Sequence, residues 1–206
     1  MRQVGKIVLS LTALYPIQGG SIKIDDCSIY DYQLELLRKG IAVVLQDVFL
    51  FSGSVLDNIK LFKEDISDEQ AIEAAKYVHV DHLINKFEKG FDTNITERAT
   101  TLSAGERQLI ALARAVVSDP KILVLDEATS NIDPVTEALI QDAMKKVSCN
   151  RTVITIAHRL STIRSADRIL VLHKGKLVEQ GSHEELMNLN GIYKQLYRLQ
   201  YDLSAS

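Results

Sequence analysis

The chain has 206 residues, of which 46% are hydrophobic and 25% are charged, and its formal net charge is −3. Such apolar content with so little net charge excludes an intrinsically disordered chain, and the slightly acidic balance excludes a generally basic nucleic-acid binder. The length suits one large domain, or two small ones, with a real hydrophobic core. The two cysteines, Cys27 and Cys149, are too few to build a disulfide framework, which favours a reducing compartment.

The N-terminus needs a separate interpretation, because Arg2 and Lys6 precede a short apolar run over residues 7–14. A positive patch before an apolar run is the outline of a signal peptide. Ser10 and Thr12 interrupt the run, however, and no small-residue cleavage site follows it. No stretch of the chain reaches the roughly 20 apolar residues that span a bilayer. We therefore interpret residues 1–14 as the start of a domain that lacks its first strands.

Apolar runs alternate with helical patterns along the chain, which predicts an α/β fold with a largely parallel sheet flanked by helices. The run Ile122–Leu125 is apolar without alternation, as expected for a strand covered on both faces. The predicted strands are residues 21–24, 41–45, 121–125, 152–156, 168–172 and 176–180. The predicted helices are residues 68–78, 105–117 and 134–147, with two more near 183–187 and 192–199.

Between residues 49 and 117 the pattern is almost purely helical, which predicts a helical subdomain inserted into the sheet domain. Two helix starts are marked by capping residues. Asp133 and Pro134 supply an N-cap acceptor followed by a proline at the first helical position. Ser103 and Glu106 have the spacing of a capping box.

The strongest chemical signal is the pair Asp126 and Glu127, directly after the predicted buried strand. A parallel strand delivers such side chains to the carboxyl edge of the sheet, where α/β proteins bind ligands. Asp126 is then placed to hold Mg²⁺, because a hard cation prefers carboxylate oxygen. Glu127 is placed to orient or deprotonate a water molecule. Two ordinary polar residues at a strand end are the alternative.

The segment Leu102–Gln108 reads L-S-A-G-E-R-Q and lies shortly before these two acids. Here the sequence resembles the ATPase domains of ATP-binding cassette (ABC) transporters, whose signature motif is L-S-G-G-Q; Ala104 and Glu106 depart from it. The resemblance implies a P-loop NTPase-like fold. It also implies that residues 103–106 (Ser103, Ala104, Gly105 and Glu106) contact the phosphates of ATP bound on an opposing subunit. A helix N-terminus favours phosphate, although a capped helix without a ligand is the alternative.

Three further positions match the family in the same chain order. Gln46, after the second predicted strand, looks like the glutamine that binds Mg²⁺ and water and links the domain to its transport partner. Asp133 ends a segment, residues 130–133, that looks like the D-loop. His158 looks like the switch histidine that contacts the γ-phosphate. The alternatives are a plain loop residue for Gln46, an N-cap for Asp133, which is compatible with the D-loop role, and a core histidine for His158.

The chain departs from the family at the phosphate-binding loop, G-x-x-x-x-G-K-[ST]. The matching residues are Gly5 and Lys6, and the first glycine of the motif falls before Met1. Ile7 stands where a Ser or Thr hydroxyl binds Mg²⁺ in the family. Because several phosphate contacts are incomplete, we expect the chain by itself to bind ATP poorly.

Segments 46–59, 157–163 and 178–186 look like the exporter subclass of the family. The resemblance implies one ABC ATPase domain over residues 1–206, with ATP and Mg²⁺ as cofactors, that couples ATP binding and hydrolysis to transmembrane transport. Its implied partners are a second ATPase domain, arranged head to tail as a homo- or heterodimer, and the transmembrane domain of an exporter at the cytoplasmic face of the cell membrane; no nucleic acid is implied. The alternative function is a hydrolysis-deficient subunit that supplies its signature motif in trans.

Overall fold

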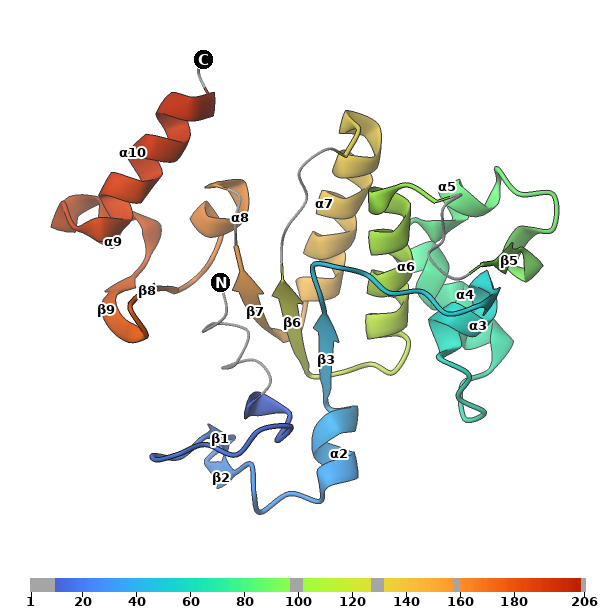
Figure 1. Cartoon of the computed structure of the whole chain (residues 1–206), viewed down its shortest axis with the longest axis horizontal. Helices are drawn as coiled ribbons and strands as arrows, with labels where there is room; N and C mark the ends of the chain where they lie inside the picture. Colours follow the sequence, from blue (N-terminus) through green and yellow to red (C-terminus); the bar gives the residue numbers. More distant parts are fainter. Residues whose placement is uncertain (1–9, 97–101, 127–131, 158–159, 205–206) are drawn as a thin grey trace. The chain divides into compact units, whose positions relative to one another are not determined.

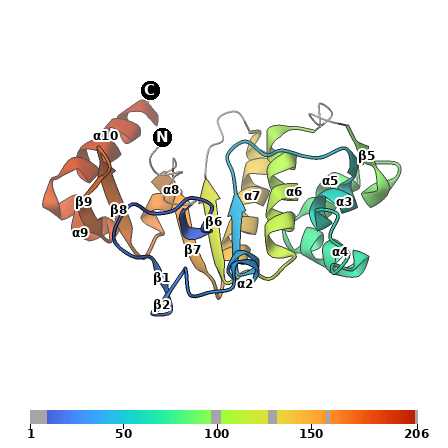
Figure 2. The same cartoon turned by 60° about the horizontal axis from the view of Figure 1, so that its bottom comes forward.

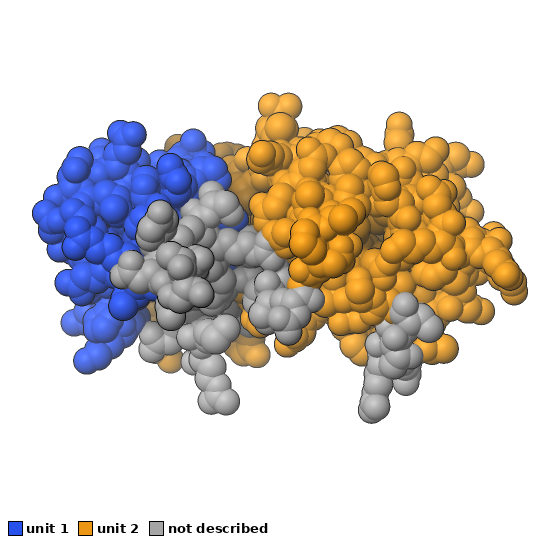
Figure 3. All heavy atoms as spheres, turned by 90° about the horizontal axis from the view of Figure 1, so that it is seen from above, with its two compact units in different colours: residues 1–3, 156–206 blue, residues 4–155 orange. Residues whose placement is uncertain are grey.

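The computed structural model describes residues 10–96, 102–126, 132–157 and 160–204 (Figure 1). The chain divides into two compact units (Figure 3). The larger unit contains residues 4–155, and the smaller contains residues 1–3 and 156–206. No helix in the described ranges is long and apolar enough to cross a bilayer.

The larger unit is built on a sheet with the strand order β3-β6-β7. The three strands are β3 (Ile41–Val44), β6 (Ile122–Asp126) and β7 (Thr152–Ile156). β3 and β6 are parallel, and Val44 lies opposite Leu125 at the end of the pairing. The α/β prediction and the three predicted core strands are confirmed to within a residue or so at each end.

Two long helices, α6 (Ala104–Val116) and α7 (Pro134–Ser148), pack against one side of this sheet and against each other (Figures 1 and 2). Their apolar residues recur every three or four positions, which places them on one face of each helix. These residues and the buried strand β6 form a common core. It includes Leu109, Leu112 and Val116 of α6, Ile140, Ala143 and Val147 of α7, and Leu123 and Leu125 of β6.

Short elements complete the larger unit. Several were not predicted, because two-residue strands and six-residue helices are too short to show a hydrophobic period. The same core joins α3, α4, α5 and α6 to β3 and β6, so the predicted helical region, residues 49–117, and the sheet share buried side chains. The elements are the antiparallel pair β1 (Lys23–Ile24) and β2 (Cys27–Ser28), α2 (Leu34–Lys39), β4 (Gly53–Ser54) paired antiparallel with β5 (Asn94–Ile95), α3 (Val55–Lys60), α4 (Asp68–Tyr77), α5 (Val80–Ile84) and the 3₁₀ turn η1 (Gly90–Asp92).

The smaller unit contains an antiparallel pair of strands, with helices packed around its own small core. β8 (Ile169–His173) pairs with β9 (Lys176–Gly181), and the chain continues as α9 (His183–Leu189) and α10 (Ile192–Ser204). α8 (Leu160–Arg164) precedes them. The core is formed by Val171, Leu186 and Tyr193, and Glu179 of β9 accepts hydrogen bonds from the N–H groups of Ile192 (2.6 Å) and Tyr193 (3.0 Å).

A buried asparagine connects three parts of the larger unit. The side chain of Asn58, in α3, accepts from the Phe51 N–H (2.8 Å) and donates to the carbonyls of Phe51 (2.9 Å) and Ser54 (3.0 Å). Arg114 of α6 donates to the Asn58 carbonyl (2.9 Å), to Asn58 Oδ1 (3.2 Å) and to the Phe49 carbonyl (3.0 Å). Burial lowers the pKa of the Arg114 guanidinium. This network fixes the segment after β3 against both α3 and α6.

Replacing Asn58 by alanine should lower the free energy of unfolding by about 2 to 4 kcal/mol, because the amide and carbonyl of Phe51 lose their buried partner. Urea denaturation of the wild type and the variant measures this loss. Asn85→Ala is the matched control, since Asn85 is exposed and ends α5 through its backbone N–H. Equal losses for the two variants would contradict the role of the network.

Candidate functional site

The carboxyl ends of β3 and β6 bring two of the predicted metal ligands to one edge of the sheet. Since Val44 lies opposite Leu125, Gln46 follows β3 within two residues of the point where Asp126 ends β6. Gln46 is exposed and Asp126 is half-buried. Both side chains offer oxygen atoms, which are the donors that Mg²⁺ prefers, so the chemistry of this pair fits that cation.

Other predicted site residues lie outside the described ranges. These are Gly5, Lys6, Glu127 and His158. Their assignments as phosphate-binding and catalytic residues stay predictions. In the sequence, Glu127 directly follows the last residue of β6, and His158 lies two residues after the end of β7.

The signature segment opens α6 with the predicted capping box. The Ser103 side chain accepts from the Glu106 N–H (3.2 Å), and the Glu106 carboxylate accepts from the Ser103 N–H (2.8 Å). Lys86, beyond the end of α5, donates to the other carboxylate oxygen of Glu106 at 2.9 Å. Glu106 therefore turns back onto its own helix start, and its charge is paired.

The titration of Glu106 reflects these contacts. Burial by itself raises the pKa of this carboxyl, but the hydrogen bonds from the Ser103 N–H and from Lys86 outweigh burial and hold the pKa below its ordinary value. The same hydrogen bond raises the pKa of Lys86. The negative charge of Glu106, a residue that the family's motif does not have at this position, is thus balanced by Lys86.

Gly105 is required by the packing of α6 on α7. A β-carbon at this position would lie 2.4 Å from Cγ2 of Thr136 and 3.1 Å from Cγ2 of Ile132. Asp133 caps α7 by accepting from the Thr136 N–H at 2.9 Å, and this hydrogen bond lowers the pKa of the Asp133 carboxyl. The predicted N-cap role of Asp133 is confirmed, and its D-loop role stays a prediction. Ser103, Gly105 and Asp133 thus belong to two helix starts that lie against each other.

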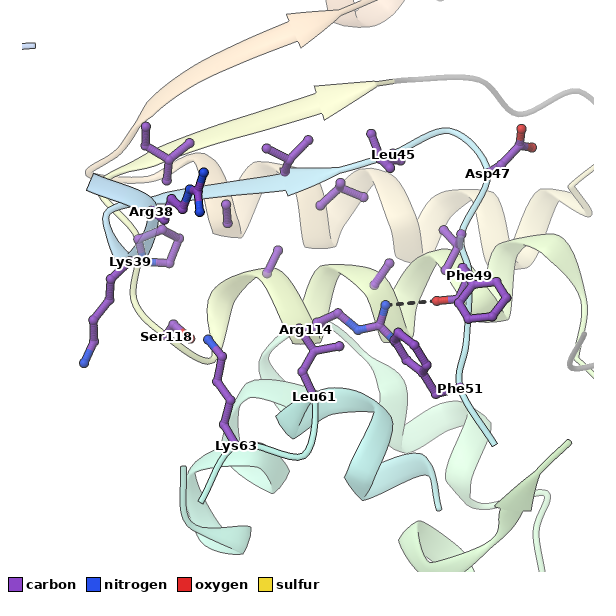
Figure 4. A pocket seen from close by; sticks show the side chains of 18 residues that line it. Arg38, Lys39, Leu45, Asp47, Phe49, Phe51, Leu61, Lys63, Arg114 and Ser118 are labelled. Atoms are coloured by element: carbon purple, nitrogen blue, oxygen red, sulfur yellow. Dashed lines mark hydrogen bonds between the residues drawn. The ribbon is translucent and has the colours of Figure 1, made fainter. Parts of the chain in front are cut away.

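A cavity of about 370 Å³ lies beside the segment that follows Gln46 (Figure 4). β3 forms one wall and α6 another, while Phe49, Phe51 and Leu61 contribute exposed apolar side chains at its edge. The rings of Phe49 and Phe51 meet edge to face at 5.0 Å between centroids. We call this cavity the coupling groove, a name taken from the role that we propose for it. Four basic residues, Arg38, Lys39, Lys63 and Arg114, also line it, together with one acidic residue, Asp47.

The sequence prediction missed the coupling groove and the Asn58–Arg114 network beneath it. The sequence does contain one sign of the groove. Three phenylalanines, Phe49, Phe51 and Phe62, lie close together in a stretch that lacks the alternation of a strand. In the structure these large apolar side chains are 43–59% exposed, and exposed aromatic side chains that lie together are typical of interaction surfaces.

Comparison with known proteins identifies the family. A family profile described as ABC transporter matches residues 5–130, which is more than half of the chain. The chain belongs to the ABC transporter family. A bacterial ABC exporter of the Atm1 family, solved with ATP bound, superimposes with a TM-score of 0.88 at 38% identity, over 96% of this chain and 35% of that one. The fold is therefore that of an ABC ATPase, and the predicted α/β fold class and family are confirmed.

Curated relatives in the family have similar sequences. The ABC transporter ATP-binding protein YknV of Bacillus subtilis, itself uncharacterized, is 47% identical over 93% of this chain and 32% of its own length. The probable multidrug resistance ATP-binding/permease protein YheH of the same organism is 50% identical over 92% of this chain and 28% of its own length. An ATP-dependent lipid A-core flippase of Shewanella is 45% identical over 90% of this chain and 31% of its own length. The chain spans about a third of the length of these relatives. ATP binding and hydrolysis are the activities that the family implies.

Replacing Glu106 by glutamine should lower the free energy of unfolding at neutral pH by about 0.5 to 1 kcal/mol, because the charge at the helix start and its pairing with Lys86 are lost. The folded pKa of Glu106 lies below its ordinary value of 4.5. The stabilisation is therefore fully present above the unfolded pKa and is lost as the pH falls through the folded pKa.

Urea denaturation of wild type and Glu106→Gln at a series of pH values below neutrality checks this prediction. The difference between the two proteins should shrink as the solution becomes more acidic than about pH 4.5, the ordinary pKa of a glutamate. Glu88→Gln, at an exposed glutamate of the same region, is the control and should lower the free energy of unfolding at neutral pH less than Glu106→Gln does. A difference that grows with acidity would contradict the assignment.

Replacing Gly105 by alanine should lower the free energy of unfolding by about 1 to 3 kcal/mol, because the new methyl group collides with Thr136. Thr136→Ser removes the methyl group that is struck and should recover much of this loss in the double variant. Denaturation of the two single variants and the double variant gives the coupling energy. Simple additivity of the two single effects would show that the contact is not the cause.

Proposed function

We propose that this chain is the nucleotide-binding domain of an ABC exporter and couples ATP binding and hydrolysis to transport across a membrane. The observation that supports this proposal best is the common sheet edge of β3 and β6, which carries Gln46 and Asp126 in a fold like that of an ATP-bound exporter. The names of the relatives, which include an ATP-binding/permease protein and a flippase, favour the same function.

The proposed nucleotide site combines this sheet edge with residues outside the described ranges. Asp126 and Gln46 are the proposed ligands of Mg²⁺, which when bound neutralises charge on the transferred phosphate. Glu127, next along the chain, would orient the attacking water and accept its proton. His158 and Lys6 would donate hydrogen bonds to phosphate oxygens, with Gly5 allowing close approach of the backbone.

The signature helix is proposed to act on a second ATPase domain, arranged head to tail with this one. The start of α6 has the positive end of a helix dipole, which favours a phosphate presented by the partner. The side chain of Ser103 and the backbone around Ala104 and Gly105 are the proposed contacts. Because Lys86 pairs with Glu106, that carboxylate would repel the phosphate weakly.

The coupling groove is the proposed contact for the transmembrane part of the exporter, at the cytoplasmic face of the membrane. It lies next to Gln46, its edge is aromatic and apolar, and its basic residues suit an acidic or helix-terminal partner. Arg114 connects the groove to α6, because it donates to the Phe49 carbonyl and sits 5.9 Å from the Phe51 ring centroid. A displacement in the groove would therefore be transmitted to the helix that begins at Ser103.

A second candidate function is a hydrolysis-deficient subunit that supplies its signature helix to a competent partner. The specific observation in its favour is Ile7, which follows Lys6 where the family has a hydroxyl ligand for Mg²⁺. In this case ATP turnover would depend on the partner's residues, and Glu127 would be dispensable.

The change Glu127→Gln distinguishes the two functions. In the transporter that contains this chain, hydrolysis by this domain should fall at least about a hundredfold, because the variant cannot accept the proton of the attacking water. Nucleotide binding should persist, since the change keeps size and polarity. ATP turnover and binding of a fluorescent ATP analogue measure the two effects.

Glu73→Gln is the matched control, because Glu73 is exposed on α4. It should leave both ATP turnover and binding of the fluorescent analogue unchanged. Full turnover in the Glu127→Gln protein would overturn the hydrolytic assignment and support the subunit that acts only in trans.

A further inference from the structure

A cluster of two histidines and an aspartate lies at the junction of α4 and α5, in the larger unit. His79, Asp81 and His82 each offer one ligand atom, and these atoms lie within 4.8 Å of one another. His79 precedes α5 in the left-handed conformation, with φ of 66°. The rings of His79 and His82 are 5.9 Å apart between centroids. The turn between the two helices therefore gathers three potential ligands, and the proposed ATPase function uses none of them.

The aspartate of this cluster has an unsatisfied oxygen. Asp81 Oδ1 is buried and has no hydrogen-bond partner in the described structure. Burying a carboxylate oxygen without a partner is costly, so native structures rarely keep one without a compensating group. A cation at the cluster would provide that compensation.

One histidine is already oriented by a carboxylate on another helix. His79 Nε2 lies 2.6 Å from Asp142 Oδ2, in α7, and because an ionised carboxylate only accepts hydrogen bonds, we assign the proton of this contact to the nitrogen. Lys146 donates to the same carboxylate oxygen at 2.8 Å, which explains why its Nζ also lies 3.1 Å from His79 Nε2. With Nε2 protonated, the lone pair of the neutral ring is on Nδ1. Carboxylates orient metal-binding histidines in this way.

We propose that His79, Asp81 and His82 bind a divalent transition-metal cation, with Zn²⁺ as the best match, and that Asp142 is the positioning residue of His79. Two imidazoles and one carboxylate, with water in the fourth place, are a ligand set that Zn²⁺ accepts, at bond lengths of about 2.0–2.2 Å. Nitrogen ligands disfavour Mg²⁺ and Ca²⁺. Ligand atoms within 4.8 Å of one another need only small side-chain rotations to reach such bonds.

The cation would fasten the α4–α5 turn to α7. His79 belongs to the turn and Asp142 to α7, and their contact is at present a single hydrogen bond supported by Lys146. Metal bonding strengthens the donor character of the second ring nitrogen, so the link to Asp142 becomes stronger when the cation binds. A cation that binds only the folded chain also raises its stability by mass action.

Calorimetric titration of the metal-free full chain with ZnCl₂ tests the proposal, together with visible absorption of the Co²⁺-loaded protein. The wild type should bind one equivalent at this site and show the intense absorption bands of tetrahedral Co²⁺. His82→Gln and His79→Gln should each weaken binding at least about tenfold, and Asp142→Asn roughly 10- to 100-fold. His173→Gln is the matched control, at an exposed histidine of the smaller unit, and should match the wild type.

His82 is exposed, so its replacement by glutamine should leave the fold intact and any loss of binding can be assigned to the lost ligand. Any Zn²⁺ held by other histidines or by the exposed cysteines Cys27 and Cys149 is common to the wild type, His79→Gln and His82→Gln, and it cancels in their comparison. Zn²⁺ should raise the melting temperature of the wild type and of His173→Gln more than that of His82→Gln. No binding by the wild type, or equal binding by wild type, His79→Gln and His82→Gln, would overturn the proposal. No readout involves ATP.

Discussion

The larger unit depends on one buried polar network, in which Asn58 and Arg114 satisfy the backbone of the segment after β3. That segment leaves the sheet at its carboxyl edge and has no long helix or strand of its own to pair its amides and carbonyls. The side chain of Asn58 does so from inside the core, and the Arg114 guanidinium fixes Asn58 in turn. A buried network of this kind stabilises only when every member is satisfied. It therefore holds the segment between Gln46 and α3 in one conformation.

The same network explains how two distant parts of the proposed mechanism share one rigid element. Arg114 lies in the last turn of α6, and Ser103 caps its first turn. The coupling groove contacts the helix at the Arg114 end, while the signature residues lie at the other. Tight packing against α7, enforced at Gly105, leaves α6 little freedom to bend. A force on the groove would then move the signature as part of one body.

The sequence predicts well those features that a long apolar pattern or a capping residue specifies. The strand before Asp126, the helices α6 and α7, and the capping box of Ser103 and Glu106 all fall in this class. The sequence predicts poorly the features that depend on contacts between residues far apart in the chain. Asn58 is a polar residue whose burial is decided by partners 7 and 56 positions away. α3 itself was missed, although its capping box of Ser54 and Asp57 was readable in the sequence. Gly105 was assigned to phosphate approach, whereas its immediate constraint is the methyl group of Thr136.

The residues after α4 include the partner that balances the charge of Glu106, which differs from the family's signature motif. Glutamate at position 106 would place an unpaired acid at a proposed phosphate site, and Lys86 offsets it. The backbone of Lys86 is fixed in turn by a hydrogen bond, because the Lys86 N–H donates to the Leu83 carbonyl at the end of α5. The α5 segment thus carries Lys86 at one end and the histidine–aspartate cluster at the other. A cation that fixes His79 and His82 would stiffen the segment that positions Lys86, so the charge balance at the signature helix rests on the same short helix as the proposed metal site.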